Sequence, residues 1–212
     1  MDTTGSFRVG GASGVREGVD TYRMKLVAIG LVLGVAVGYL RGGRLSQLSE
    51  LRPRYAPLAL AGLLLQLVNP PGSWPLVLLI LSFVLLLAFT IANLRIVGFA
   101  AILAGVLMNF LVIAINGGMP VAREAIIASG QASTLAPLLE QRGVKHHLAG
   151  PDDRLLFLGD VIGIPAPVSQ VISVGDVFTY GGVAIVIAGS MRRRRSPAPR
   201  LTPVTEGPRV QV

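Results

Sequence analysis

The sequence predicts an all-α integral membrane protein, a bundle of about five transmembrane helices with an ordered cap on its outer mouth. Of the 212 residues, 52% are hydrophobic and only 14% are charged, and the mean hydropathy is +0.66. Charged residues normally make up about a quarter of a soluble domain. A single soluble core cannot bury this much apolar surface, so lipid must be the solvent for much of the chain.

The net charge of +8 and the absence of cysteine exclude several classes of protein. The basic residues fall beside apolar runs and in the C-terminal tail, without an aromatic-rich basic face, so we expect no nucleic-acid partner. Without cysteine, disulfides, thiolate metal sites and thiol catalysis are excluded. We expect the lipid bilayer as the main partner and no cofactor.

Five apolar segments are candidates for transmembrane helices, which need about 20 residues, with a range of about 17 to 25. They cover residues 24–40, 55–68, 74–92, 96–115 and 177–191. The second is short and carries Pro57 and Gln66, which neighbouring helices would shelter. The first is followed by a basic flank and not by a small-residue cleavage site, so we expect an anchor and not a signal peptide.

Arginine placement orients the chain, because short cytoplasmic loops are enriched in lysine and arginine. Arginines crowd two connections and the start of the tail: Arg41, Arg44, Arg52, Arg54, Arg95 and Arg192 to Arg195. We therefore expect the insert at residues 116–176 outside the cell membrane, the N-terminus outside and the C-terminus in the cytoplasm. We expect residues 1–23 to be a flexible extension of the membrane domain 24–191, with translation starting at either Met1 or Met24. We expect residues 192–212 to form a basic, Pro-rich disordered tail.

The first transmembrane segment carries Gly30, Gly34 and Gly38 at four-residue spacing, which lets another backbone approach closely. Packing within the chain is one interpretation, and a face for a homo-oligomer or a membrane-protein partner is the other. No charged residue lies in the middle of a transmembrane segment, which argues against an ion-coupled transporter. We expect Gln66 and Asn109 to form hydrogen bonds between helices.

The outer insert has two kinds of segment. Residues 121–130 and 133–142 have the character of short surface helices. Residues 155–172 are apolar but interrupted by glycine, aspartate and two prolines. This segment is too broken to cross the membrane, so we expect it to be re-entrant or to lie at the membrane interface.

The insert also holds the candidate ligand-binding residues. They are Asn116, Gly117, Gly118, His146 and His147. The first three suit a tight turn with positive backbone angles. Adjacent histidines do not easily point at one ion, so we expect no metal site. The leading hypothesis is an integral membrane protein of unknown activity whose cap binds a partner or a small ligand.

Two aspartates, Asp160 and Asp176, each follow a glycine and precede apolar residues. Ser173-x-x-Asp176 matches a capping box, in which a serine and an acid three residues later bond the free amides of a helix start. Asp160 is suited to capping a short helix in the same way. In the alternative hypothesis the two carboxylates form a catalytic pair, one holding a proton while the other activates water. The sequence leaves open whether the protein is an enzyme.

Residues 172–176, before the final helix, resemble the aspartate motif of lipoprotein signal peptidase, a membrane aspartyl protease. This resemblance implies catalytic roles for Asp160 and Asp176 in an intramembrane aspartyl hydrolase. Phe157 and Val161 stand where that family has asparagine and arginine around its first aspartate. The similarity is confined to this local motif.

A second resemblance runs over residues 24–191. It rests on the order of Asn-Gly-Gly-Met-Pro-Val, Lys-His-His, Leu-Gly-Asp-Val-Ile and Ile-Ser-Val-Gly-Asp-Val-Phe, followed by a last helix with basic residues behind it. The chain is similar in this order to an uncharacterised bacterial family of multi-pass membrane proteins, a domain of unknown function. The resemblance implies a membrane location and no particular activity.

Overall fold

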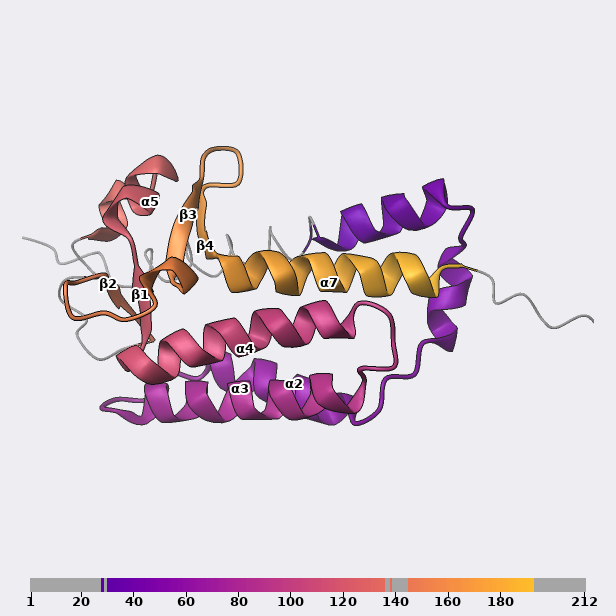
Figure 1. Ribbon diagram of the computed structural model, residues 1–212, viewed down its shortest axis with the longest axis horizontal. Helices are drawn as coiled ribbons and strands as arrows, with labels where there is room; N and C mark the ends of the chain where they lie inside the picture. Colours follow the sequence, from indigo (N-terminus) through magenta and orange to yellow (C-terminus); the bar gives the residue numbers. More distant parts are fainter. Residues whose placement is uncertain (1–27, 29, 136–137, 139–144, 193–212) are drawn as a thin grey trace, which may run out of the picture.

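The computed structural model describes residues 28, 30–135, 138 and 145–192. The extension predicted for residues 1–23 lies outside the described residues, as does the predicted tail after Arg192. Figure 1 shows an elongated body of helices that run side by side, with a small sheet at one end.

Five helices of the described part form the body. They are Gly30–Leu40, α2 (Ala56–Leu67), α3 (Trp74–Ala92), α4 (Phe99–Asn116) and α7 (Val174–Ser190). Wherever both are described, their ends differ from those of the predicted apolar segments by at most three residues. By length and composition, α3 and α4 are candidate membrane spans, and the other three helices are apolar but shorter.

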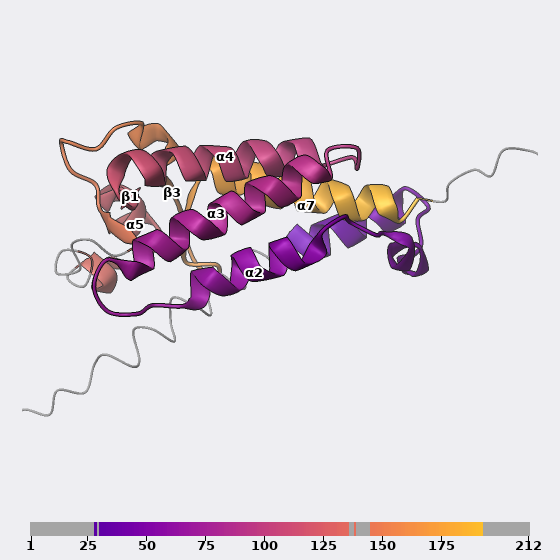
Figure 2. The same ribbon diagram turned by 90° about the horizontal axis from the view of Figure 1, so that it is seen from below.

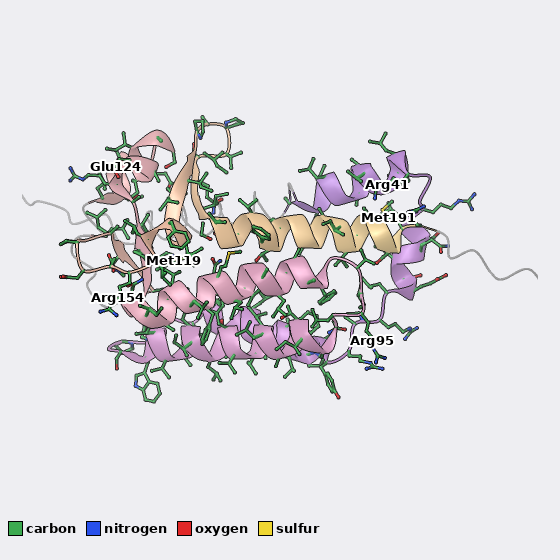
Figure 3. All side chains as sticks on the ribbon, viewed as in Figure 1. Arg41, Arg95, Met119, Glu124, Arg154 and Met191 are labelled. Carbon is green, nitrogen blue, oxygen red and sulfur yellow. The ribbon has the colours of Figure 1, made fainter. Side chains whose placement is uncertain are left out.

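The connections between helices alternate between the two ends of the body (Figures 1 and 2). The sheet and the α2–α3 loop lie at one end, and the α3–α4 loop and the 3-10 helix η1 (Leu45–Glu50) lie at the other. Figure 3 places Arg41 and Arg95 at the end with η1, and Glu124 and Arg154 at the end with the sheet. Polar loops are thus gathered at the two ends.

Large apolar side chains are exposed along the outer helices. Those on α2 and α3 are Leu60, Leu63, Leu64, Leu67, Trp74, Val77, Leu81, Val84 and Ile91. The buried core lies inside, where α3, α4 and the first strand meet: Leu79, Phe83, Val106, Val112, Ile113 and Met119. An apolar outer surface of this extent is typical of a protein surface that is covered by lipid or by another protein.

Helices α4 and α7 pack antiparallel through glycines on both sides. A Cβ atom added to Gly175 would lie 2.7 Å from the carbonyl oxygen of Gly105, and one added to Gly182 would lie 2.9 Å from that of Gly98. Side chains do not fit at such distances, so the two backbones touch directly. Small residues at the interface between two helices allow such a close approach of the backbones.

The glycine stripe of the first helix also faces α7. It consists of Gly30, Gly34 and Gly38. A Cβ on the first would lie 3.6 Å from Tyr180, one on the second would lie 3.0 Å from Ala184, and one on the third would overlap Met191. Packing within the chain therefore accounts for the spacing. Association with a second copy or a membrane-protein partner through this face stays a prediction.

A four-stranded sheet corrects the prediction of an all-α fold, because the protein is mostly helical with a small mixed sheet. The strands, in the spatial order β2-β1-β3-β4, are β1 (Met119–Val121), β2 (His146–Leu148), β3 (Asp160–Ile164) and β4 (Gln170–Ser173). Strand β1 pairs parallel with β2 and β3, and β3 pairs antiparallel with β4. Strands of three to five residues are too short for alternation to reveal them.

The sheet also changes the interpretation of residues 155–172. This segment, predicted to be re-entrant or interfacial, forms the 3-10 helix η3 (Leu156–Leu158) and then the β3–β4 hairpin. The surface helix predicted at 121–130 is confirmed as α5 (Arg123–Ala128). The one predicted at 133–142 coincides in part with η2 (Ala132–Thr134), and most of its remainder lies outside the described residues.

Candidate functional site

The sheet gathers polar segments that are far apart in the sequence. Strand pairing places Met119 opposite His146, Val121 opposite Asp160, and Asp160 opposite Ser173. Since β1 follows α4 and β4 runs directly into α7, these residues collect at the end of the α4–α7 pair (Figure 1). The polar segments of the insert therefore meet at this end, which we call the cap end.

The predicted capping box at the start of α7 is confirmed. The Ser173 hydroxyl accepts a hydrogen bond from the Asp176 amide at 3.0 Å, and the Asp176 carboxylate accepts one from the Ser173 amide at 3.0 Å. These two bonds satisfy amide groups that have no partner within the helix. The first turn of α7 is thus fixed by its own side chains.

Asn109 of α4 closes the capping box into a network. Its side-chain amide donates to Asp176 Oδ1 at 2.9 Å, and its Oδ1 accepts from the Ser173 hydroxyl at 2.9 Å. Ser173 is fully buried and Asn109 is 7% exposed. The prediction that Asn109 forms a hydrogen bond between helices is confirmed. The amide side chain uses its donor on Asp176 and its acceptor on Ser173.

Asp160 begins β3 and not a helix, so the capping role expected for it is wrong. It is buried, with its Oδ2 atom 3.9 Å from His146 Nε2. The His146 side chain is 29% exposed, against 11% for that of Asp160. The pair therefore presents an imidazole to the surface and a carboxylate beneath it.

The two aspartates of the proposed catalytic pair come from neighbouring positions. Asp160 pairs with Ser173 in the sheet, and the amide of Ser173 donates to the Asp176 carboxylate. Both oxygens of Asp176 accept hydrogen bonds, one from Ser173 and one from Asn109. The geometry brings the residues together and at the same time uses Asp176 to hold the helix start. A catalytic role for the two stays a prediction.

The second histidine stabilises a loop. His147 Nε2 lies 2.9 Å from Asp153 Oδ1, while Asp153 Oδ2 accepts from the Gly150 amide at 2.7 Å. The two histidines thus face different carboxylates. In the part of the chain that the structure describes, no three histidine, aspartate or glutamate side chains gather as ligands for a metal ion.

The Asn116-Gly117-Gly118 turn joins α4 to the cap. Asn116 donates to the carbonyls of Val112 and Arg154 and accepts from the Arg154 amide, at 2.8 to 2.9 Å. Gly117 and Gly118 have φ angles of +67° and +155°, as the predicted tight turn requires. The Asn116 side chain thus bonds the backbone of its own helix and of the cap. Any ligand contact by the three residues of this turn stays a prediction.

Lys145 is a residue that sequence reasoning missed. It is only 7% exposed, and its ammonium group donates to the carbonyls of Gln66 and Val68 at the C-terminal end of α2. A cation is favoured there because the last carbonyls of a helix carry partial negative charge. Gln66 also donates to Ser82 of α3 at 2.9 Å, which confirms its predicted interhelical bond.

The comparisons with known proteins give one family. The model of a family of unknown function, DUF5317, matches residues 53–188. No curated protein and no solved structure matches the chain. The family match confirms that the sequence resembles an uncharacterised family, and the similarity to lipoprotein signal peptidase stays a prediction.

Proposed function

The chain belongs to this family of unknown function, and from its geometry we propose a multi-pass integral membrane protein whose cap binds a partner or a small ligand. The observation that carries this proposal is the separation of three surfaces along one axis. Apolar helices form the middle, a sheet with a partly exposed His146–Asp160 pair forms one end, and arginines form the other.

Helix dimensions support a membrane location. The 19 residues of α3 extend over about 28 Å, close to the hydrocarbon thickness of about 30 Å. Helix α4, with 18 residues, is similar. The remaining three helices run beside them, and the exposed leucine and valine side chains on α2 and α3 would contact acyl chains. We propose that all five helices are embedded.

The distribution of charge supports an orientation. The described part of the cap carries three basic residues: Arg123, Lys145 and Arg154. The opposite end carries Arg41, Arg44, Arg52, Arg54, Arg95 and Arg192, with Glu50 as the acidic residue of η1. The positive-inside rule then puts the arginine end in the cytoplasm and the cap outside.

Single cysteines test this topology, because the natural chain has none. Asp152→Cys in the cap and Ser46→Cys in η1 are both at exposed positions. We expect a membrane-impermeant maleimide to label the first in intact cells and the second only after permeabilisation. Labelling of both in intact cells, or release of the protein by alkaline carbonate, would contradict the proposal.

Binding by the cap is tested with a photo-reactive amino acid at Phe157. This side chain is 66% exposed and lies three residues before Asp160. Trp74, 61% exposed, provides a matched aromatic position at the same end on α3. We expect a discrete adduct from position 157 that is lost when His146→Ala is added, and no such adduct from position 74. Adducts that form equally well in the His146→Ala variant would contradict the binding proposal.

An aspartyl hydrolase is the second candidate, supported by the position of Asp160 opposite Ser173, which bonds Asp176. A hydroxyethylamine peptide mimic that carries a photo-reactive group tests it, since it resembles the hydrated peptide bond. Labelling that disappears in Asp160→Asn, with unchanged thermal stability, would favour the hydrolase. Absence of labelling in the natural protein would remove it.

A further inference from the structure

A cavity of about 780 Å³ lies at the arginine end, away from the cap. It is open to the surface and is lined by the Gly30–Leu40 helix, η1, the α3–α4 loop and the last turns of α7. Its volume falls in the range of about 300 to 1,000 Å³ that is typical of ligand sites. Nothing assigned to the cap uses this space.

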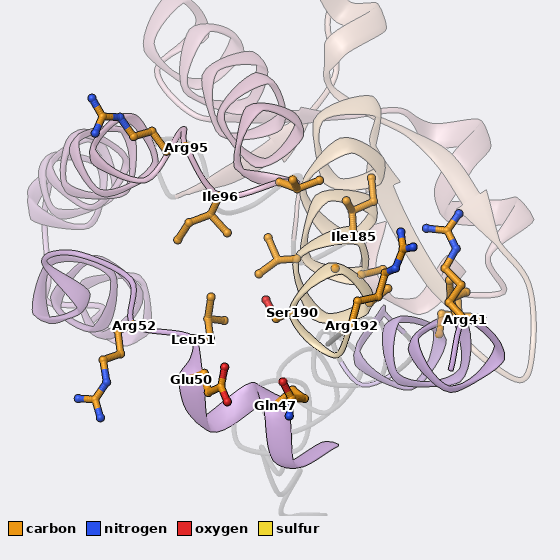
Figure 4. A pocket seen from close by; sticks show the side chains of 17 residues that line it. Arg41, Gln47, Glu50, Leu51, Arg52, Arg95, Ile96, Ile185, Ser190 and Arg192 are labelled. Carbon is orange, nitrogen blue, oxygen red and sulfur yellow. The ribbon is translucent and has the colours of Figure 1, made fainter. Parts of the chain in front are cut away.

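The lining of the cavity is amphipathic. Its walls include Leu33, Leu51, Ile96, Val97, Ile185 and Val186. Four arginines stand against a single acidic residue, Glu50: Arg41, Arg52, Arg95 and Arg192. In Figure 4 the arginines lie on opposite sides of the cavity, and Arg52 and Arg95 direct their guanidinium groups away from its centre. An aliphatic interior with a cationic rim matches a molecule that has an acyl chain and an anionic head.

We propose that this cavity binds an anionic phospholipid, with acyl chain against the aliphatic walls and phosphate at the arginine rim. The inference rests on the proposed membrane location. Basic pockets between membrane helices on the cytoplasmic side bind acidic lipid head groups, and this leaflet is the one enriched in them. Arginine suits the task because its planar guanidinium bonds phosphate oxygens in pairs.

Gly189 gives a position from which a side chain can be directed into the cavity. It lines the cavity near the end of α7, and a Cβ atom added there would meet no atom within 4 Å. Gly181, on the same helix, also has open space around it but does not line the cavity. Gly189→Leu and Gly181→Leu are therefore a matched pair: both add the same side chain to α7, but only the first adds it at the cavity.

The experiment uses the full chain, purified in detergent and depleted of lipid, with binding followed by native mass spectrometry. The probes are phosphatidylglycerol, phosphatidylcholine and inorganic phosphate. We expect phosphatidylglycerol to bind about tenfold more tightly than phosphatidylcholine, with about a fivefold loss for each of Arg41→Gln and Arg192→Gln. Arg54→Gln, at the same end but outside the lining, is expected to change nothing.

The cavity-filling pair decides the location of the lipid. Gly189→Leu is expected to abolish the preference for phosphatidylglycerol, and Gly181→Leu to retain it. Equal effects of the two, equal affinity for both lipids, binding of phosphate without lipid, or a second copy of the chain in place of lipid would overturn the proposal. Failure of the membrane location is recognised separately, because carbonate would then extract the protein from membranes.

Discussion

The carboxylate of Asp176 accepts a hydrogen bond from the side-chain amide of Asn109 at 2.9 Å, across 67 positions of sequence. This bond joins the first turn of α7 to the middle of α4. It lies beside the glycine contacts, where a Cβ on Gly175 would overlap Asn109. The polar network and the close backbone approach therefore occupy one contact region between α4 and α7.

Removal of the Asp176 carboxylate is expected to destabilise the protein. Asp176→Ala leaves the Ser173 amide and the Asn109 side-chain amide without acceptors, which costs about 2 kcal/mol of the free energy of unfolding. Chemical denaturation in detergent measures this loss. Asp152→Ala, at an exposed loop position, is the control and should have no effect. Equal stability of both variants would refute a structural role for the network.

The glycine contact between α4 and α7 predicts opposite effects of one substitution at two positions. Gly105→Ala places a methyl group where it would overlap Gly175 and Thr179, so a loss of about 1 to 3 kcal/mol is expected. Gly181→Ala has open space and gains about 0.5 to 1 kcal/mol from helix propensity. Thermal unfolding of the two proteins in the same detergent gives the comparison, and shifts of the same sign would contradict the packing.

Lys145 is expected to hold the end of α2. Lys145→Met keeps the length of the side chain but loses both bonds to the carbonyls of Gln66 and Val68. Hydrogen exchange at the last turn of α2 should then rise, because that turn frays when its cation is gone. Exchange in α4 serves as the internal control. An unchanged α2 would show that the lysine does not stabilise this helix end.

The parallel pairing of β1 and β2 is tested by a disulfide. Met119 and His146 are partners in the sheet, so Met119→Cys with His146→Cys should oxidise to an intramolecular bridge. Met119→Cys with Leu148→Cys is two positions out of register and should stay reduced. The natural chain supplies no competing thiol. Mobility on a non-reducing gel separates the two results, and bridging in both pairs would exclude a fixed register.

The helices were predictable because each rests on a long apolar run. Residues 74–92 were expected as a span, and the helix is Trp74–Ala92. The capping box was predictable because Ser173 and Asp176 are three positions apart, which is the spacing of this motif. Such local signals are complete in the sequence, and packing of the helices against one another does not alter them.

The sheet and the buried contacts were not predictable, because their partners are distant in sequence. Strand β1 has three residues and pairs with a strand that begins at His146. The sequence around Lys145 does not indicate that its ammonium group bonds carbonyls at the end of α2. Asn109 was expected to bond another helix, yet only the structure identifies Asp176 as its acceptor. Short strands and single polar side chains acquire partners only when the chain folds.

Ser173 is the last residue of β4 and also the cap of α7, so no linker separates the sheet from the last helix. A shift of α7 along its axis must therefore pull on β4, the edge strand of the sheet. The packing of α7 therefore affects a part of the protein outside the helices, namely the resistance of the cap to proteases. Protease digestion of the cap would thus report on the position of α7, although the cleaved bonds lie outside that helix.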